Sequence, residues 1–232
     1  RSRGLGDVYK RQVYVRIIDY KTGKKDFNIV KTYYGIDIQL MVYMEAAMKL
    51  VAKMRPGKNV IPAGVFYYNI SDPIVSATTE SAEEIEDKIK GELRLKGMVN
   101  SDKDIAEKMD NTEGTSLNIP VSRKADGGFD SRRSKVMNTE QFNMLGRFVD
   151  VRAVDTADRI AGGDIRRSPY KDGQFSSCDR CPYGAVCGFS VDLPGCNYRK
   201  LKKFDDEVLW NNIEEGVDEN GKKMDTGAEE RD

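Results

Sequence analysis

Two apolar, strand-like runs flank an amphipathic helical segment within the first 70 residues, and this pattern constrains the fold more than any other feature of the chain. Residues 13–18 read Val-Tyr-Val-Arg-Ile-Ile, and residues 63–70 are similarly rich in β-branched and aromatic side chains. The segment between them, about residues 33–53, has an apolar stripe at three- and four-residue spacing: Ile36, Leu40, Tyr43, Ala47, Leu50 and Met54. The pattern predicts a βαβ unit in an α/β domain, with the first strand buried on both faces and the second strand central in its sheet.

Length and charge exclude several classes of protein. A chain of 232 residues can bury the core of one ordinary domain and a small appendage. Lys and Arg number 38, as do Asp and Glu, so overall charge does not direct the chain to nucleic acid, and DNA contacts must come from local patches. No run approaches the roughly 18 apolar residues of a membrane span, and no secretory leader is present. We therefore expect a cytoplasmic protein with no membrane partner.

All four cysteines lie within one short segment: Cys178, Cys181, Cys187 and Cys196. A tight cluster in a chain without an export signal predicts a metal or iron-sulfur site rather than disulfides. The Cys-x2-Cys-x5-Cys spacing suits thiolates around one inorganic cluster, and four thiolates would also suit structural zinc. Because the chain has no histidine, it cannot build a Ser/His/Asp triad, a Cys/His dyad or a His-ligated zinc site by itself.

Composition divides the chain into five predicted segments. The third opens with a Ser81-x-x-Glu84 capping box, and the fourth opens with a helix that starts near Asn138 and stops at Gly162. The segments are a non-native or disordered leader at 1–12, a core at 13–75, a charged helical insertion at 76–137, a helix plus cysteine segment at 138–204, and an acidic, largely disordered tail at 205–232.

A glycine-containing stretch near the end of the insertion concentrates basic side chains. Within residues 121–135 the candidate DNA contacts are Arg123, Lys124, Arg132 and Arg133. A flexible basic loop of this kind suits contacts with phosphates, although a solvated loop without a partner has the same composition.

The first strand ends in a pair of side chains that suit phosphodiester chemistry. Asp19 and Lys21 are two residues apart, so both project from the same face of a strand. A carboxylate there can help to hold Mg²⁺, and a lysine can stabilise charge on the attacking water or on the pentacovalent phosphate. The pair taken alone equally describes a surface ion pair at a strand end.

The following helix adds an amide and a phenol. Gln39 and Tyr43 are four residues apart and therefore share one helix face, so both can point at the same place. Tyr43 also lies on the apolar stripe, and a core tyrosine with a solvated hydroxyl explains it as well.

In this order, Asp19-Tyr-Lys21, Gln39-x3-Tyr43 and the late cysteines resemble the RecB-like branch of the PD-(D/E)XK nucleases. More closely, four motifs are similar to those of the AddB-type subunits of bacterial helicase-nucleases: residues 16–25, 62–68 and 95–98, and Cys178-x2-Cys181-Pro-Tyr-x3-Cys187-Gly-Phe. The resemblance covers roughly residues 13–201. It implies a restriction-endonuclease-like core, incomplete at its N-terminus, with the charged insertion and a C-terminal iron-sulfur segment.

The resemblance also implies an activity and roles for the motif residues. The family's exonuclease domain cuts DNA during double-strand-break processing for recombinational repair, and its partner is an AddA-type helicase/nuclease subunit. Asp19 would ligate Mg²⁺, Lys21 would be the catalytic lysine, and Gln39 and Tyr43 would line the site. A structural 4Fe-4S cluster would be held by Cys178, Cys181, Cys187 and one upstream cysteine, with Cys196 as a substitute fourth ligand or an incidental thiol.

The family's earlier catalytic carboxylate and its distant cluster cysteine correspond to positions before Val13. We therefore interpret the chain as a C-terminal fragment and expect little or no nuclease activity from it alone, because a lone Asp19 gives Mg²⁺ too few protein ligands. Two alternatives remain. One is a Cas4-like iron-sulfur nuclease, which the long separation of Tyr43 from Cys178 disfavours, and the other is a non-catalytic, zinc-bound DNA-binding module.

Overall fold

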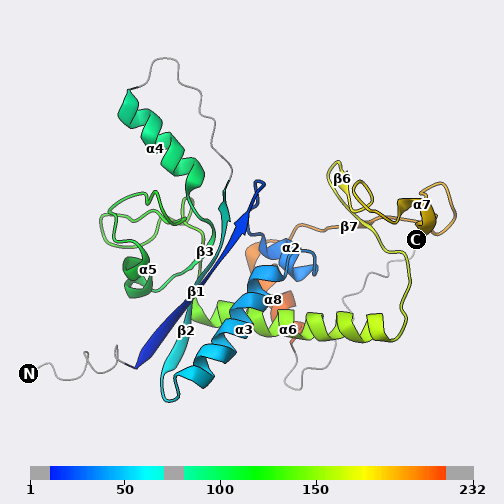
Figure 1. Cartoon of the computed structure of the whole chain (residues 1–232), viewed down its shortest axis with the longest axis horizontal. Helices are drawn as coiled ribbons and strands as arrows, with labels where there is room; N and C mark the ends of the chain where they lie inside the picture. The colour runs from blue at the N-terminus through cyan, green and yellow to red at the C-terminus, as the bar shows by residue number, and fades with distance from the viewer. Residues whose placement is uncertain (1–10, 71–80, 218–232) are drawn as a thin grey trace, which may run out of the picture. The chain divides into compact units, whose positions relative to one another are not determined.

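The computed structural model describes residues 11–70 and 81–217 (Figure 1). The chain divides into two compact units, residues 1–150 and 151–232. The first unit contains a four-stranded sheet, and the second contains a small three-stranded sheet. Within the described residues, no helix has the length and apolar character that a bilayer crossing would need.

The predicted βαβ unit is confirmed. Strand β1 (Gln12–Lys21) pairs in parallel with β2 (Asn59–Asn69), and helix α3 (Gln39–Met54) contacts both strands. The register places Asp19 beside Tyr67 and Lys21 beside Asn69. Paired residues of neighbouring strands share a face, so the end of β1 and the end of β2 present these side chains together.

Strand β1 is less buried than the sequence predicts. The sheet order is β1-β2-β3-β4, so β1 is an edge strand in the part of the chain that the structure describes, and Val15 is its one fully buried residue. The expected burial on both faces is therefore wrong for β1, whereas the central position expected for β2 is right, since it lies between two strands. A register shift after Val15 lies opposite Pro62, which has no backbone donor for the ladder.

The helix predicted from about residue 33 begins later, at Gln39, and a separate short helix precedes it. Helix α2 (Ile29–Tyr33) ends before Gly35, whose φ of 74° suits glycine, and α3 begins at Gln39. The buried face of α3 also differs from the predicted stripe, since three of its residues are exposed: Tyr43, Leu50 and Met54. The buried residues are Leu40, which belongs to the predicted stripe, and Met41 and Met44, which do not. The buried face of the helix is therefore rotated toward Met41 and Met44.

The predicted insertion contributes half of the main sheet. Strand β3 (Lys96–Asn100) pairs antiparallel with β2, and β4 (Val136–Met137) pairs in parallel with β3. The described part of the predicted insertion, residues 81–137, is therefore not separate from the core, because its apolar side chains complete the cluster around Phe66: Val99, Ala106, Ile119 and Val121. The predicted capping box is confirmed at the start of helix α4 (Ala82–Leu93).

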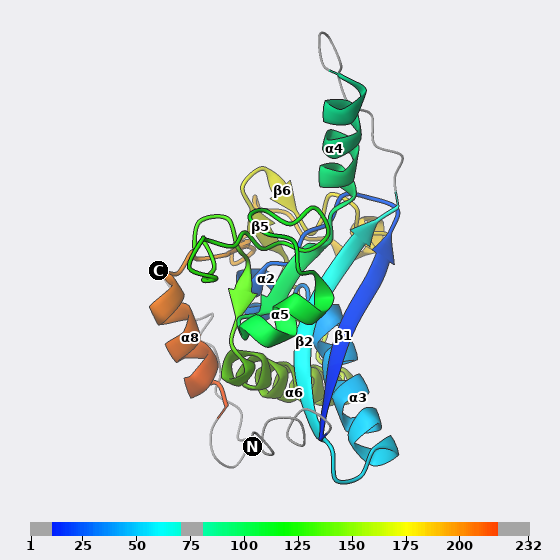
Figure 2. The ribbon, with the colours of Figure 1, turned by 90° about the vertical axis from the view of Figure 1, so that its left-hand side faces the viewer.

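The two faces of the sheet have different neighbours. Helix α5 (Lys103–Met109) contacts β3, whereas α3 contacts β1 and β2, and Figure 2 shows these helices on opposite sides of the sheet. Side chains alternate between faces along a strand, so Phe66 points toward the α5 side and its neighbour Tyr67 toward α3. The α3 side is therefore the side that receives Asp19 and Lys21.

Hydrogen bonds cross-link the stretch between α5 and β4, which includes the basic loop predicted at residues 121–135. The buried carboxylate of Asp110 accepts hydrogen bonds from Thr112, Ser116 and Asn118. Burial alone would raise the pKa of Asp110, but these hydrogen bonds lower it to about 2. Arg94 adds two hydrogen bonds to the carbonyl oxygens of Ile119 and Val121.

Helix α6 (Thr139–Ala161) runs from the first unit into the second. It begins near Asn138, as the sequence predicts, and the Asn138 and Gln141 side chains cap its start reciprocally. Toward its other end Ile160 is 71% exposed. The small sheet has the order β6-β5-β7. The remaining elements are β5 (Tyr170–Asp172), β6 (Phe175–Ser176), α7 (Gly184–Cys187), β7 (Arg199–Lys200) and α8 (Asp206–Glu215).

The terminal segments differ from prediction where the structure describes them. The predicted disordered tail at 205–232 instead begins with α8, because Leu209 and Ile213 are four residues apart and both are buried. The predicted leader at 1–12 overlaps β1, which includes Gln12. Residues 1–10, 71–80 and 218–232 lie outside the described residues.

Candidate active site

The site lies where β1 and β2 end on the α3 side of the sheet. Alternation along β1 puts Asp19 and Lys21 on this face, and the Lys21 ammonium nitrogen lies 2.8 Å from Asp19 Oδ2. Both side chains are largely but not wholly covered, at 18% exposed for Asp19 and 26% for Lys21. The ion pair is therefore reachable from solvent at the edge of a buried sheet.

Helix α3 completes the arrangement that the sequence predicts. Lys21 Nζ donates a 2.8 Å hydrogen bond to Gln39 Oε1, and Gln39 Nε2 donates a 2.9 Å hydrogen bond to the Tyr43 hydroxyl. The four predicted residues thus form one continuous chain of polar contacts from strand to helix. Tyr43 is half exposed, so it is not the core tyrosine that its position on the stripe also allowed.

Asp19 Oδ2 is held by the Lys21 ion pair alone. The atom is buried, lies 2.8 Å from Lys21 Nζ, and accepts no hydrogen bond from the described residues. A buried carboxylate oxygen in this state is a suitable donor atom for a hard divalent cation such as Mg²⁺. Within the described residues, however, no three Asp, Glu, Cys or His side chains form a group that could hold a metal ion.

A second polar cluster beside the first was not predicted. The Tyr67 hydroxyl donates a 2.7 Å hydrogen bond to Asp37 Oδ1, and Lys25 Nζ lies 3.0 Å from the same oxygen. The Asn69 side chain accepts a hydrogen bond from the Lys25 backbone amide. Tyr67 and Asn69 could have been predicted, because they lie beside Asp19 and Lys21 in the neighbouring parallel strand and share their face of the sheet. Asp37 could not, because it lies in a turn before α3, where the sequence has no periodic pattern.

Tyr67 links the two clusters. Its ring is fully buried and has Lys21 Nζ 5.6 Å and Lys25 Nζ 4.9 Å from its centroid. Burial, together with the hydrogen bond to Asp37, raises the pKa of the Tyr67 hydroxyl far above its usual range. Tyr67 therefore stays a neutral donor and holds the Asp37 carboxylate in place beside two lysines.

The four candidate DNA contacts do not behave alike. Arg123 is partly buried and donates hydrogen bonds to the carbonyl oxygens of Asp110 and Thr112, so it holds the loop together and is not a mobile phosphate contact. The other three are exposed: Lys124, Arg132 and Arg133. A role for these three in DNA binding stays a prediction.

The cysteine segment lies in the second unit. All four thiols are free and half-buried, but they do not form a metal-holding group in the described residues. Arg167 donates hydrogen bonds to the carbonyl oxygens of Cys187 and Gly188. The side chains as placed therefore do not fit an iron-sulfur cluster or a zinc ion without rearrangement of the loop.

Comparison with known families gives a match over most of the chain. Residues 7–188 match the family described as the PD-(D/E)XK nuclease superfamily. This range includes β1, α3 and β2, and also three of the four cysteines.

Similar proteins are named as the B-type subunit of an ATP-dependent helicase/deoxyribonuclease. The protein from Caldanaerobacter subterraneus subsp. tengcongensis is 38% identical over 220 residues, or 94% of this chain and 19% of that protein. Those from Thermoanaerobacter sp. (strain X514) and Lachnoclostridium phytofermentans are 35% and 36% identical, over 94% and 97% of this chain. The chain spans about a fifth of the length of these relatives, 19% and 20% in the last two cases.

Proposed function

Because the chain belongs to the PD-(D/E)XK nuclease superfamily, we propose that it serves, within a longer subunit, to hydrolyse DNA phosphodiesters at the site built around Lys21. The observation that carries the proposal is the position of the Lys21 ammonium group, which is held between Asp19 and Gln39 at 2.8 Å from each partner atom. A cation fixed in this way stabilises the negative charge that develops on phosphorus-bound oxygens during hydrolysis.

The other polar residues position this lysine. Gln39 can only accept from an ammonium group through its Oε1 atom, and the hydrogen bond from its Nε2 atom to Tyr43 holds the amide in that orientation. The preorganised ammonium group needs little rearrangement as the transition state forms. Because Lys21 and Tyr43 are both partly exposed, a DNA strand can reach them from solvent.

We propose Asp19 as one protein ligand of Mg²⁺, since its buried Oδ2 atom accepts no hydrogen bond among the described residues and is held only by the ion pair with Lys21. Bound there, Mg²⁺ would lower the pKa of a coordinated water and neutralise phosphate charge. One carboxylate is too few for a tight site, so we propose that the 232-residue chain alone has little activity. Strong Mg²⁺-dependent cleavage by the chain alone, abolished by Lys21→Ala, would contradict this.

We further propose that the chain is the nuclease part of a longer, AddB-type subunit. The support is the set of relatives named as the B-type subunit of an ATP-dependent helicase/deoxyribonuclease, of which the chain matches about a fifth, 19% in the example from Caldanaerobacter. On this proposal the partner is an AddA-type helicase subunit that delivers unwound DNA, and the reaction serves double-strand-break repair. The relatives' name favours this assignment over a Cas4-like nuclease.

The cysteine segment is proposed to bind a structural 4Fe-4S cluster. The support is the spacing of Cys178, Cys181 and Cys187 together with the family match, which ends at residue 188. Because the thiols as placed do not form a ligand group among the described residues, no step of the reaction is assigned to the cluster.

The test of the proposed function uses the longer subunit that contains this chain, assayed for cleavage of single-stranded DNA with Mg²⁺. Asp19→Asn should reduce the rate by about a hundredfold or more, because it removes the proposed metal ligand. Asp150→Asn is the matched control, since Asp150 also pairs with a lysine, Lys49, but lies away from Asp19 on α6. Cleavage by the Asp19→Asn variant at the same rate as the wild type and the Asp150→Asn control would contradict the proposed function.

A further inference from the structure

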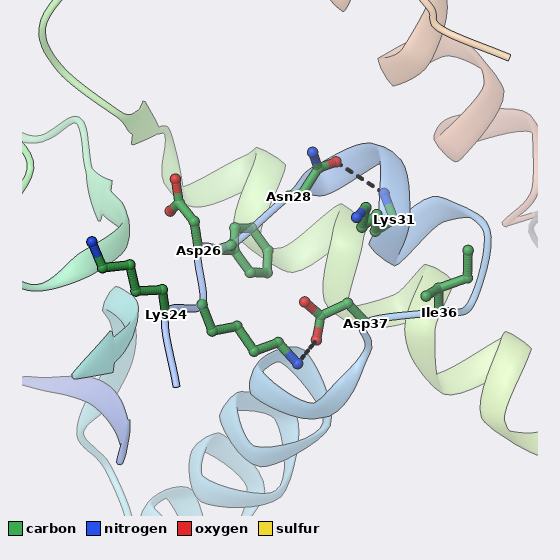
Figure 3. A pocket seen from close by; sticks show the side chains of 8 residues that line it. Lys24, Asp26, Asn28, Lys31, Ile36 and Asp37 are labelled. Atoms are coloured by element: carbon green, nitrogen blue, oxygen red, sulfur yellow. Dashed lines mark hydrogen bonds and ion pairs between the residues drawn. The ribbon is translucent and has the colours of Figure 1, made fainter. Parts of the chain in front are cut away.

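A polar pocket lies in the segment that directly follows the Lys21 strand. Its volume is about 400 Å³, and it is formed within residues 24–37, between the end of β1 and the start of α3. Figure 3 shows side chains from this one stretch around the pocket, and a dashed line at the Asp37 carboxylate marks its ion pair with Lys25. Its polar lining residues are Lys24, Lys25, Asp26, Asn28, Lys31 and Asp37. None of these residues has a role in the proposed reaction.

The pocket is joined to the Lys21 site through Tyr67. Lys21 Nζ and Lys25 Nζ lie 5.6 Å and 4.9 Å from the centroid of the same buried ring, so they can be no farther apart than the sum of these distances. The spacing of neighbouring phosphates along a DNA strand falls within this limit. An extended strand with one phosphate at Lys21 can therefore place a nearby phosphate at Lys25.

The charges and donors of the pocket suit an anion. Three lysines and two carboxylates line it, and one of the carboxylates, Asp26, is paired with Lys135, which lies outside the lining. Lys25 is the ion-pair partner of the other carboxylate, Asp37, so the lining keeps an excess of positive charge from Lys24 and Lys31. Lys24 is 85% exposed and lies 3.8 Å from Glu92, an exposed pair that contributes little and that an anion can displace.

Asn28 supplies a neutral donor to the same pocket. Its Oδ1 atom accepts from the Lys31 backbone amide, and this orientation leaves the Nδ2 group as a donor. Ammonium and amide donors together are the groups that bind phosphate oxygens in protein–DNA contacts.

We propose that this pocket, the Lys25 pocket, is a second phosphate subsite, which binds a backbone phosphate of the same DNA strand close to the phosphate attacked at Lys21. Tyr67 and Asp37 position the Lys25 ammonium group, and Lys24 and Asn28 supply further donors. The inference rests on the proposed function, because it takes the strand at Lys21 as its starting point. The proposal adds the residues of the Lys25 pocket to the DNA-binding site, where they fix the position of the strand before cleavage.

The experiment measures binding rather than cleavage, with the 232-residue chain, Ca²⁺ in place of Mg²⁺ and a fluorescent single-stranded oligonucleotide. Lys25→Gln should weaken binding about fivefold at low salt, and the slope of log affinity against log salt should fall by about 0.7, the loss of one phosphate contact. Lys24→Gln should act in the same direction, and because Lys24 is exposed its substitution leaves the fold intact. Lys25→Arg keeps the charge and should restore most of the affinity.

Lys49→Gln is the matched control, since Lys49 also pairs with an aspartate but lies on α3 away from the pocket. A series of oligonucleotides, each with one neutral methylphosphonate linkage, locates the contact. One linkage should weaken binding to the wild-type chain and have no further effect on Lys25→Gln.

Two results overturn the inference. In the first, Lys25→Gln and Lys24→Gln bind like Lys49→Gln, and in the second, the wild-type chain binds no oligonucleotide. The proposed function fails in a different assay, when the longer subunit with Asp19→Asn cleaves DNA as fast as the wild type, so the two failures are distinguishable.

Discussion

At the scale of single residues, the proposed chemistry depends on how Lys21 is held. Its ammonium group lies between a carboxylate on its own strand and an amide on the next helix, and each contact is 2.8 Å long. A flexible lysine loses side-chain entropy on becoming ordered, so two partners that fix it in advance reduce that cost during the reaction. On the proposed function, Gln39 is therefore a positioning residue.

Gln39→Leu tests this positioning. We expect DNA cleavage by the longer subunit to fall about ten- to a hundredfold, while the free energy of unfolding changes by only about 1 kcal/mol. Tyr43→Phe removes only the hydroxyl that orients the amide, so its effect on the rate should be smaller. A wild-type rate for Gln39→Leu in a single-turnover assay would show that the hydrogen bond from Lys21 has no role in catalysis.

At the scale of elements, the turn around Asp110 gives a pH dependence. The pKa of Asp110 is lowered to about 2 in the folded chain from an ordinary 3.8. The ionised carboxylate therefore contributes its full share to the free energy of unfolding above pH 3.8, and this share is lost as the pH falls through the pKa of the folded state. Asp110→Asn should thus cost about 2 kcal/mol at pH 6, and the difference should shrink toward zero near pH 2. Urea unfolding at several pH values measures it.

Asp126→Asn is the control for this comparison. Asp126 is an exposed aspartate in the same stretch, where it accepts one hydrogen bond from a backbone amide. Its substitution should change the free energy of unfolding by less than about 0.5 kcal/mol at any pH. A difference for Asp110→Asn that stays constant from pH 6 to pH 2 would contradict the assignment of the pH dependence to this carboxylate.

The pairing of β2 with β3 depends on a glycine. A Cβ atom at Gly97 would lie 1.9 Å from the backbone oxygen of Val65, which cannot move without breaking the ladder. Gly97→Ala should therefore destabilise the chain by more than about 3 kcal/mol. Gly91→Ala, within α4 with open space around it, should instead be neutral or stabilise by about 0.5–1 kcal/mol, and thermal unfolding compares the two.

The elements also show what the sequence could predict. Local signals were sufficient for the βαβ unit, the capping box at Ser81 and the Gln39–Tyr43 face, because each depends on spacing within one segment. The charged stretch after residue 76 was wrongly predicted to be an insertion, because its polar composition gives no signal for β3. This five-residue strand pairs with β2, about thirty residues earlier in the chain. Asp37 and Lys25 were missed because turn residues meet only through tertiary contacts.

At the scale of the whole molecule, the chain consists of two units with different chemistry. The Lys21 site and the Lys25 pocket lie within residues 1–150, and the cysteines lie within residues 151–232. Within this chain, the groups assigned to the proposed reaction all belong to the first unit. Substitutions in the cysteine segment should therefore affect stability and metal content before they affect the chemistry at Lys21.

Metal analysis checks that separation. After anaerobic purification of the longer subunit that contains this chain, we expect iron and acid-labile sulfide in near-equal amounts, and Cys187→Ser should lose both. Cys196→Ser separates a fourth ligand from an incidental thiol, since only loss of a ligand removes iron. Stoichiometric zinc without iron would contradict the cluster proposal and favour a structural zinc site of four thiolates.

The central claim is that Lys21 acts in phosphodiester hydrolysis, and single-turnover cleavage tests it most directly. A labelled single-stranded oligonucleotide is mixed with a saturating excess of the longer subunit carrying either the wild-type sequence or Lys21→Ala, so that differences in affinity do not affect the rate. We predict a cleavage rate lower by about 10²–10³ for Lys21→Ala, with an unchanged free energy of unfolding to within about 1 kcal/mol. Equal cleavage rates for the two proteins would contradict the claim.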